Sequence, residues 1–312
     1  MQPSDTHSAA ADATGAERAA LLTRDGVVAV DKPAGVTSRR VVDVVARCLG
    51  TRAAGHAGTL DPLAEGVVLV CLGAATRLVD FLHELPKHYT ATFLLGRSSP
   101  SDDLETEVVV AEPLQRPDRE TIEAALPAFR GTVLQRPCDY SAVHVDGKRA
   151  YRLARQGRPV PLAPKPVRIE RLEITGYDWP RLGLDIVCSS GTFVRAIGRD
   201  LAESLGTRGV MESLVRVAVG PFTRSAAVPL AAVSPESIAA AVVSPAAAVG
   251  HLPRLVLEGD ALARAARGMM LALEADAAET LAAVDAAGSL VGILRRHPSG
   301  GHRLRPNFLG VG

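Results

Sequence analysis

The residues of this chain that are best suited to chemistry lie in one short glycine-rich segment. Its sequence is GHAGTLDPLAEG, residues 55–66, and it brings three glycines together with His56 and the carboxylate of Asp61. Glycine adopts positive φ angles and lets a ligand or another backbone approach closely. The proline after Asp61 restricts the backbone of Asp61 and thereby the direction of its side chain. The segment indicates either a turn that the carboxylate caps or a carboxylate held in place for a reaction.

Two phosphate-binding motifs are excluded for these glycines. A P-loop requires Gly-Lys followed by Ser or Thr at the start of a helix, and this triplet does not occur here. A dinucleotide-binding fingerprint follows a strand, whereas this segment precedes the apolar run of residues 67–72, which is typical of a buried strand. The glycines are therefore not expected to bind a phosphate.

The segment resembles the catalytic segment of the pseudouridine synthases, and in particular that of the TruB family, which isomerises uridine 55 in the T-loop of transfer RNA. Further blocks that resemble this family follow in its order over about residues 25 to 225. They are DKPAG (31–35), KHY (87–89), YSA (140–142), GKRAY (147–151), ARQG (154–157), CSSGTFVR (188–195) and LVR (214–216). Because the blocks are many and in order, the resemblance favours a reactive role for Asp61 over a capping role.

The resemblance implies a role for each matched residue. Asp61 is implied as the nucleophile, Arg195 as the guanidinium that pairs with it, and Tyr89 as the ring that stacks on the uracil and as a carrier of the proton. Substrate contacts are implied at four other matched positions, namely Lys32, His56, Phe193 and Leu214. The alternative for these four is structural, as members of turns or of the core. Whether Asp61 attacks C1′ of the sugar or C6 of the uracil is open.

The implied reaction determines what the site must contain. It breaks the C1′–N1 bond of uridine and forms a C1′–C5 bond without redox change or energy input, so neither a metal nor another cofactor is expected. A carboxylate in a closed pocket is desolvated, which raises its pKa, and a neighbouring guanidinium offsets this by about 1–3 pKa units. The target base must leave its stack at a cost of a few kcal/mol. Stacking on an aromatic ring, worth about 1–3 kcal/mol, offsets that cost.

Patterns of apolar residues predict the elements that hold these residues. Strands are expected at 27–30, 67–72, 89–95, 141–145, 167–177 and 182–188 and near Val133, and helices after Thr37 or Ser38 and over 78–85, 118–126 and 192–205. The polar segment 96–107 is expected to form an exposed loop. Such mixed elements predict an α+β fold with a mixed, largely antiparallel central sheet flanked by helices, which is also what the resemblance implies.

Changes in composition divide the chain into four parts. Residues 1–23 are expected to form a disordered tail and residues 24–230 the catalytic domain. A break after Pro229 starts a helix or linker over 231–250. The β-rich remainder, 251–312, resembles the PUA-like RNA-binding domain of the family.

A basic segment lies within about 138–171, where the resemblance implies an RNA-binding insertion. Residues 148–171 contain eight basic side chains and only one acid. On a helix, Lys148, Arg152 and Arg155 would share one face. Together with Arg149 they are expected to contact the phosphate backbone of the RNA, with a solvated surface as the alternative.

Several positions depart from the family pattern, namely Phe193 in place of tyrosine, Cys138 in place of proline and His144 in place of lysine. Glu65 replaces a small or hydroxyl residue. If Glu65 faced inward it would raise the pKa of Asp61, so we expect it to face outward. The loop 98–107 lacks the usual pattern, and Asp102 or Asp103 is its remaining acid.

Composition sets the outer limits of function. The chain has 312 residues, of which 47% are hydrophobic, and a formal net charge of +1. No stretch approaches the roughly 20 apolar residues of a membrane span, and the N-terminus lacks the pattern of a secretory signal. The four cysteines lie far apart, which favours buried thiols over a zinc site or disulfides. We therefore expect a cytoplasmic protein that contacts no membrane and is a monomer.

Three functions are compatible with the sequence. The resemblance favours an active isomerase of uridine 55 that binds transfer RNA at its T-arm. The alternatives are a synthase of the same lineage that acts on another RNA, and a non-catalytic RNA-binding or RNA-folding protein. The presence of Asp61, Tyr89 and Arg195 favours an enzyme.

Overall fold

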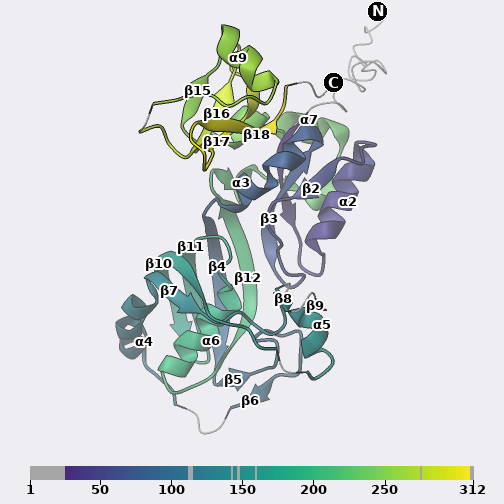
Figure 1. Cartoon of the computed structure of the whole chain (residues 1–312). Coiled ribbons are helices and arrows are strands. Elements are labelled where there is room, and N and C mark those ends of the chain that lie inside the picture. Colours follow the sequence, from purple (N-terminus) through teal and green to yellow (C-terminus); the bar gives the residue numbers. More distant parts are fainter. Residues whose placement is uncertain are drawn as a thin grey trace, which may run out of the picture.

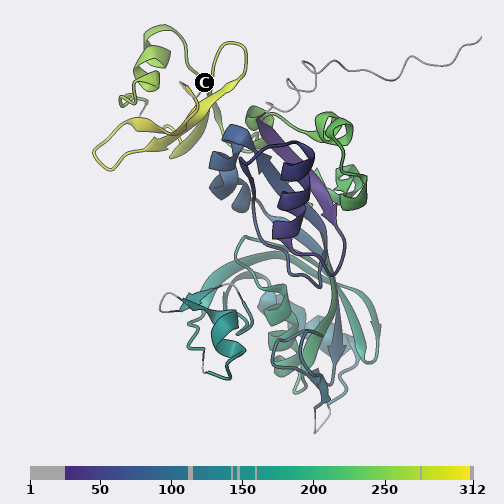
Figure 2. The same ribbon diagram turned by 90° about the vertical axis from the view of Figure 1, so that its right-hand side faces the viewer.

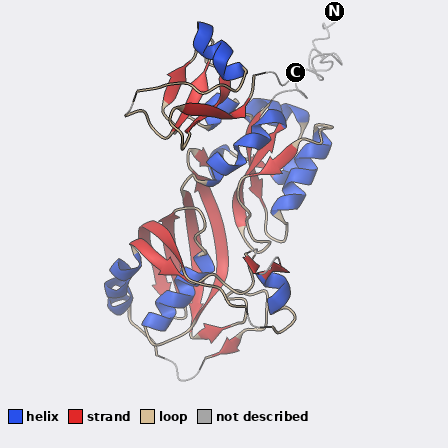
Figure 3. Cartoon of the chain, in the orientation of Figure 1, coloured by secondary structure: helices blue, strands red, loops and turns tan. Residues whose placement is uncertain are grey.

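The structure, a computed structural model, describes residues 25–111, 115–141, 143–145, 148–158, 160–274 and 276–309 (Figure 1). The predicted tail of residues 1–23 and parts of the predicted basic insertion lie outside these ranges. The described residues form a large sheet with helices on its faces and a small sheet near the C-terminus (Figure 3). The predicted α+β fold with a mixed, largely antiparallel central sheet is therefore confirmed.

The large sheet has the strand order β14-β1-β3-β12-β4-β11-β10-β7. Its strands are β1 (Gly26–Lys32), β3 (Glu65–Leu72), β4 (Lys87–Leu95), β7 (Gly131–Gln135), β10 (Lys165–Asp178), β11 (Arg181–Cys188), β12 (Gly209–Val219) and β14 (Val228–Pro229), with β2 (Ala54–His56) beside β3 and β13 (Phe222–Thr223) beside β12. The pairs β1–β14 and β3–β12 are parallel, and the long pairings of β4 with β11 and β12 are antiparallel. β12 joins the two halves of the sheet.

Helices lie on both faces of this sheet, and one of them, formed by Ala150–Ala154, packs in a separate apolar cluster. They are α2 (Ser38–Cys48), α3 (Val79–His83), α4 (Arg119–Ala125), α5 (Ala150–Ala154), α6 (Val194–Ser204), α7 (Pro235–Ala241) and α8 (Pro245–Ala248), with 3-10 turns η1 (Gly73–Leu78), η2 (Leu126–Phe129), η3 (Arg224–Ala226) and η4 (Leu230–Ala232). Successive residues of β1 and β3 point to opposite faces of the sheet, where each face packs into its own apolar core. Both strands are therefore continuous apolar runs. Val28 packs with α2, whereas Val27 packs with η1 and α3.

The second half of the sheet packs closely against α6. Alternate residues of β4 are buried, and Tyr89 and Phe93 belong to the same core as residues of α6. A Cβ atom at Gly198 of α6 would lie 2.1 Å from ring carbons of Phe93. The absence of a side chain at position 198 therefore sets how near α6 lies to the sheet.

The small sheet has the order β15-β16-β17-β18 and lies at one end of the molecule (Figure 2). Its elements are β15 (Arg254–Val256), α9 (Gly259–Ala266), β16 (Thr280–Val284), β17 (Leu290–Arg296) and β18 (His302–Asn307). Ala282 and Ile293 of this sheet belong to the same buried cluster as Leu78 and Phe81 of the large unit. The two units therefore share apolar contacts.

Three local expectations are wrong. The segment 96–107 is not an exposed loop, because Ser101 and Asp103 are buried and β5 (Arg97–Ser98) pairs with β6 (Val109–Val110). The strand expected over 141–145 is reduced to β8 (His144–Val145), which pairs with β9 (Lys148–Arg149). Lys148 therefore lies on a strand and not on a helix face with Arg152, because a hairpin occupies the start of the expected helix.

Three of the four cysteines, Cys71, Cys138 and Cys188, are buried free thiols, and Cys48 is half-buried. Across the described ranges, no helix is both long and apolar enough to cross a membrane.

Candidate active site

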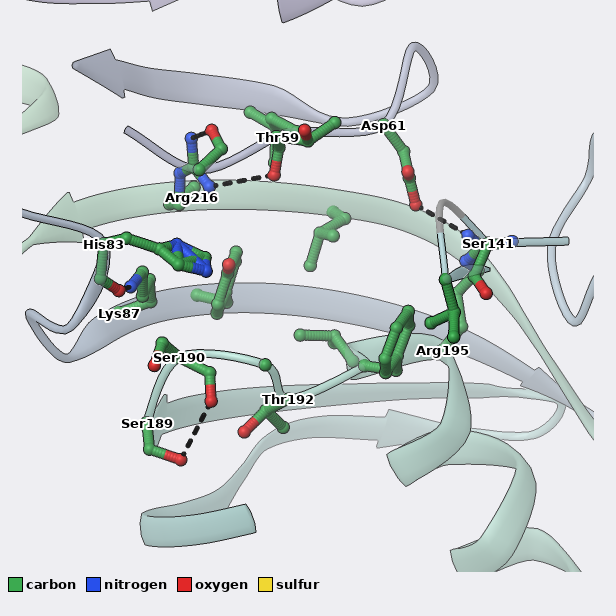
Figure 4. Close-up of a pocket in the computed structure, with 18 residues that line it drawn as sticks. Thr59, Asp61, His83, Lys87, Ser141, Ser189, Ser190, Thr192, Arg195 and Arg216 are labelled. Carbon is green, nitrogen blue, oxygen red and sulfur yellow. Dashed lines mark hydrogen bonds and ion pairs between the residues drawn. The ribbon is translucent and has the colours of Figure 1, made fainter. Parts of the chain in front are cut away.

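A cavity of about 370 Å³ lies between the segment 58–61, the start of β4, the middle of β12, the start of α6 and the loop residues Ser141 and Val143. Its lining includes five of the residues that the sequence singles out, namely Asp61, Tyr89, Phe193, Arg195 and Leu214. Figure 4 shows Asp61 and Arg195 at one end of the cavity and His83 and Lys87 at the other. Residues from five separated stretches of the chain therefore meet here.

The backbone around Asp61 is held by hydrogen bonds from both sides. The buried hydroxyl of Ser38 donates to the carbonyl of Leu60 at 3.0 Å and accepts from its N–H at 2.8 Å. The carbonyl of Pro62 accepts from the N–H of Gly35 at 2.8 Å. The carboxylate of Asp61 is thus presented by a fixed loop, with 40% of its side chain exposed toward the cavity and solvent.

Arg195 pairs with Asp61, as the resemblance implies. Its Nη2 lies 2.9 Å from Oδ2 of Asp61, and the guanidinium is only 6% exposed. Burial opposes the charge of Arg195, but nearby carboxylates, foremost Asp61, raise its pKa above the ordinary value. An arginine that stays charged keeps a positive group beside Asp61 at all accessible pH values.

A second acid, Asp103, is buried and also contacts Arg195. Oδ2 of Asp103 lies 3.0 Å from Nη1 of Arg195, and the same Nη1 donates to the carbonyl of Ser101 at 2.9 Å. Of the two acids that the sequence left open, Asp103 therefore contacts Arg195, whereas Asp102 lies 3.0 Å from Nη1 of Arg199. Within the loop 98–107, Ser101 and Asp103 are buried, and the pairing of Asp103 with Arg195 offsets the cost of removing its charge from water.

The aromatic residue Tyr89 lies in the middle of the cavity wall. Burial raises the pKa of its phenol, and the charge of Arg216 opposes this rise only in part. The phenol is therefore protonated near neutral pH. Its ring is available to a planar ligand, since Tyr89 lines the cavity from β4.

Arg216 is a site residue that the sequence did not single out beyond its place in the LVR block. It is 1% exposed, and its Nε donates to the carbonyl of Val67 at 2.7 Å. Its Nη1 and Nη2 donate to the carbonyls of Thr59 and Gly58, each at 3.3 Å. Arg216 thus holds the backbone that leads to Asp61, and the match to a family block was the signal that could have found it.

Lys32 and His56 are not among the residues that line this cavity. Nζ of Lys32 donates to the carbonyls of Val36 at 2.6 Å and Pro62 at 3.3 Å, which is the turn-stabilising role left open above. Burial lowers the pKa of Lys32 to about 8. Burial also lowers the pKa of His56, whose Nδ1 is buried without a hydrogen-bond partner among the described residues.

The far end of the cavity is basic. Lys87 is 4% exposed, and its ammonium donates to the carbonyl of His83. Burial and the charge of Arg216 lower the pKa of Lys87 to about 8. Ser189 and Ser190 also line the cavity at this end (Figure 4). A nucleotide in the cavity would meet a carboxylate at one end and basic and hydroxyl groups at the other.

Of the other departures, Glu65 faces away from the cavity as predicted. It pairs with Nη2 of Arg224 at 3.0 Å and does not line the cavity. Cys138 is buried, and burial raises the pKa of its thiol. The side chain of His144 lies outside the described residues.

The predicted basic surface is described only in part. The side chains of Lys148 and Arg149 lie outside the described residues. Arg152 is exposed, whereas Nη2 of Arg155 lies 3.2 Å from the carboxylate of Glu105. The cation at Arg155 is therefore partly compensated by an acid from a distant loop.

The chain shares its sequence pattern with known proteins. Residues 46–194 match the model of the TruB family pseudouridylate synthases, N-terminal domain. A protein named tRNA pseudouridine synthase B from Parasynechococcus marenigrum is 40% identical over 272 residues, which cover 86% of this chain and 92% of that protein. A protein of the same name from Gloeobacter violaceus is 42% identical over 248 residues, covering 77% of this chain and 84% of that protein.

Two solved structures share the fold. A Cbf5-Nop10-Gar1 complex contains a chain that superposes with a TM-score of 0.69 at 24% identity, covering 89% of this chain and 80% of that one. The archaeal box H/ACA sRNP Nop10-Cbf5 complex gives a TM-score of 0.68 at 24% identity, covering 92% of this chain and 86% of that one. At this identity the likeness concerns the fold alone.

Proposed function

Because the chain belongs to the TruB family of pseudouridylate synthases, we propose that it converts uridine 55 in the T-loop of transfer RNA to pseudouridine. The family makes it an isomerase of uridine in RNA, and its relatives are named for their action on tRNA. The observation that carries the proposal is the ion pair of 2.9 Å between Asp61 and the buried Arg195 at the end of a nucleotide-sized cavity.

In this proposal Asp61 is the nucleophile. Its carboxylate adds to C1′ of the ribose or to C6 of the uracil, and either route separates N1 from C1′, turns the uracil and joins C5 to C1′. The bond to Asp61 is then broken, N1 takes up a proton from water and the proton on C5 leaves to water, so atoms and electrons balance without a redox partner. Arg195 supports this role because its guanidinium lies beside the carboxylate and fixes its direction.

The flipped uracil is proposed to lie against Tyr89, with Phe193 and Leu214 completing the apolar wall. These three side chains line the same cavity as Asp61. Stacking on an aromatic ring contributes about 1–3 kcal/mol, which offsets the cost of extruding the base. Phe193 lacks the hydroxyl of tyrosine, so it can contribute packing but no hydrogen bond from its side chain.

The proposed RNA contacts lie on both sides of the cavity. Arg152 and Arg155 are proposed to contact the phosphate backbone, together with Lys148 and Arg149, and the C-terminal unit is proposed to act as a PUA-like RNA-binding domain. The exposed position of Arg152 supports the first part. The second part is supported by the small four-stranded sheet and by the family.

A release assay tests the proposed function. T-loop RNA labelled with tritium at C5 of the target uridine is incubated with the protein, and label released to water is counted. We expect release by the wild-type protein and a loss of at least about 10⁴-fold with Asp61→Ala, because the nucleophile is removed. Asp61→Asn, which keeps the shape of the side chain, is the matched variant and should be equally inactive.

The other outcomes identify the alternatives. Release from another RNA but not from the T-loop would indicate a synthase with a different substrate. Tight binding of T-loop RNA without release from any RNA would indicate a non-catalytic RNA-binding protein. Equal release by Asp61→Asn and wild type would contradict the role of the carboxylate.

A further inference from the structure

We propose that Gln135 is a positioning residue for the active site, which acts by fixing both peptide groups of Phe193 at the start of α6. The inference rests on the proposed function, because its readout is the isomerisation of uridine. Gln135 does not line the active-site cavity, and it is the last residue of the edge strand β7.

The contact is reciprocal and buried. The N–H of Phe193 donates to Oε1 of Gln135 at 2.8 Å, and Nε2 of Gln135 donates to the carbonyl of Phe193 at 3.1 Å. Gln135 is 4% exposed, so water competes little with either hydrogen bond. Fixing the N–H and the C=O of one residue fixes the peptide planes on both sides of its Cα atom, and hence the direction of its side chain.

No side chain of α6 itself can provide this restraint. Phe193 is the N-cap residue and its side chain makes no capping hydrogen bond. In a capping box, a Glu or Gln three residues after the N-cap would satisfy the N–H of the N-cap, but Ala196 occupies that position and has no polar group. Gln135 satisfies that N–H from a strand that is 58 residues away in sequence.

The restrained residue controls two parts of the site at once. The ring of Phe193 lines the cavity, and Arg195 lies two residues later in the first turn of α6. After Gln135 the chain continues over the same helix, where the carbonyl of Tyr140 accepts from Nη2 of Arg195 at 2.9 Å. A rotation of the helix start would therefore move both the wall against the uracil and the guanidinium beside Asp61.

The expected effect concerns the chemical step more than binding. Misplacement of a catalytic group by about 1 Å can lower a rate about 10²-fold. We expect Gln135→Met, which keeps the size of the side chain but removes both hydrogen bonds, to lower kcat for tritium release about 10- to 100-fold with a smaller change in KM.

The variant Gln135→Glu gives a readout that a purely structural role would not give. An ionised carboxylate accepts from the N–H of Phe193 but cannot donate to its carbonyl, whereas a protonated carboxyl does both. Burial raises the pKa of the introduced carboxyl. The kcat of Gln135→Glu divided by that of wild type should therefore rise as the pH falls from about 8 to about 6, while the same ratio for Gln135→Met stays flat.

Leu134→Ala is the matched control, since Leu134 is the neighbouring residue on β7 and is 75% exposed. It should keep the wild-type kcat. Thermal unfolding of each variant shows whether it is folded under assay conditions, and if Gln135→Met does not fold, the pH-dependent ratio of Gln135→Glu still decides.

The proposed function and this inference fail separately. Absence of release by the wild-type protein contradicts the function alone. If the wild-type protein is active, a wild-type kcat in Gln135→Met, or a Gln135→Glu ratio that does not change with pH, overturns the inference. A crystal structure of Gln135→Met with Phe193 and Arg195 unmoved would also overturn it.

Discussion

The guanidinium of Arg216 is buried against the backbone that leads to Asp61, where it is held by three main-chain carbonyls. Its donors reach the carbonyls of Val67, Thr59 and Gly58. These carbonyls belong to the glycine-rich segment 55–66 and to the strand β3 that follows it. Arg216 thus links the shape of the loop to β12, on which it lies.

Replacing Arg216 with lysine should therefore disturb the loop. We expect Arg216→Lys to lower kcat about 10-fold or more, and to lower the free energy of unfolding by about 1–3 kcal/mol, because one ammonium cannot reach three carbonyls and leaves buried acceptors unpaired. Tritium release and urea denaturation measure the two effects. Arg181→Lys, at an exposed pair with Glu212, is the control and should change neither quantity. An Arg216→Lys protein with wild-type kcat would contradict this role.

At the scale of single residues, the sequence was better at indicating which side chains form the site than at predicting what they contact. Asp61, Tyr89 and Arg195 stand in contiguous blocks, so their types and order were sufficient to choose them. The resemblance also implied the pairing of Asp61 with Arg195, but the hydrogen bonds that hold the surrounding backbone were not predictable. The contact of Gln135 with Phe193 spans 58 positions and that of Arg216 with Val67 spans 149, and no local pattern encodes which distant carbonyl a donor will meet.

Helix α6 illustrates how one element depends on a missing side chain. A glycine inside a helix normally costs about 1 kcal/mol relative to alanine, so Gly198→Ala should stabilise an isolated helix. Here the added Cβ would lie 2.1 Å from the ring of Phe93. The packing against β4 therefore decides whether Gly198→Ala raises or lowers the free energy of unfolding.

We expect Gly198→Ala to lower the free energy of unfolding by about 1–3 kcal/mol, as overpacked cores do, and to reduce kcat because α6 carries Arg195. Urea denaturation and tritium release provide the measurements. Adding Phe93→Leu to Gly198→Ala removes the ring and should recover part of the stability. An increase in stability for Gly198→Ala alone would show that the helix can move without cost.

Helices and strands were predictable where a single local sequence pattern determines them. The apolar runs of β1 and β3, the alternating apolar residues of β11 and the cap at Thr37 were found because burial and capping act locally. Strand β12 was missed, although it lies at the centre of the sheet, because its sequence mixes polar and apolar residues. The helix expected from Lys148 was wrong because pairing of β8 with β9 replaces its first turn.

At the scale of the molecule, we expect the positive charges of the predicted basic segment to attract the phosphates of the RNA. Removing Arg152 and Arg155 together should reduce the slope of log K against log salt concentration by about 1 for each phosphate that the variant no longer neutralises. Binding of T-loop RNA at several salt concentrations measures this slope. Arg119→Gln, on the exposed face of α4, is the control and should leave the slope unchanged. A slope that is unaltered in the double variant would exclude this surface from RNA binding.

The topology of the large sheet was beyond the reach of the sequence. The strand order places β12 between β3 and β4, although β12 follows both by more than a hundred residues. Only this placement brings the segment of Asp61, on the β3 side, to the same cavity as Tyr89 of β4. The family resemblance implied that these residues meet, whereas apolar patterns and turn signals do not specify which strands pair.

The apolar contact between the small sheet and the large unit has a consequence for any shortened version of the chain. Ile293 and Ala282 are buried with Leu78 and Phe81, and the guanidinium of Arg295 lies 4.6 Å from the ring centre of Phe81. A protein truncated near residue 250 would leave this surface in water and would tend to self-associate. In the intact chain the same contact restricts rotation of the small sheet relative to the large sheet. An RNA that contacted both units would therefore have to fit a fixed distance between them.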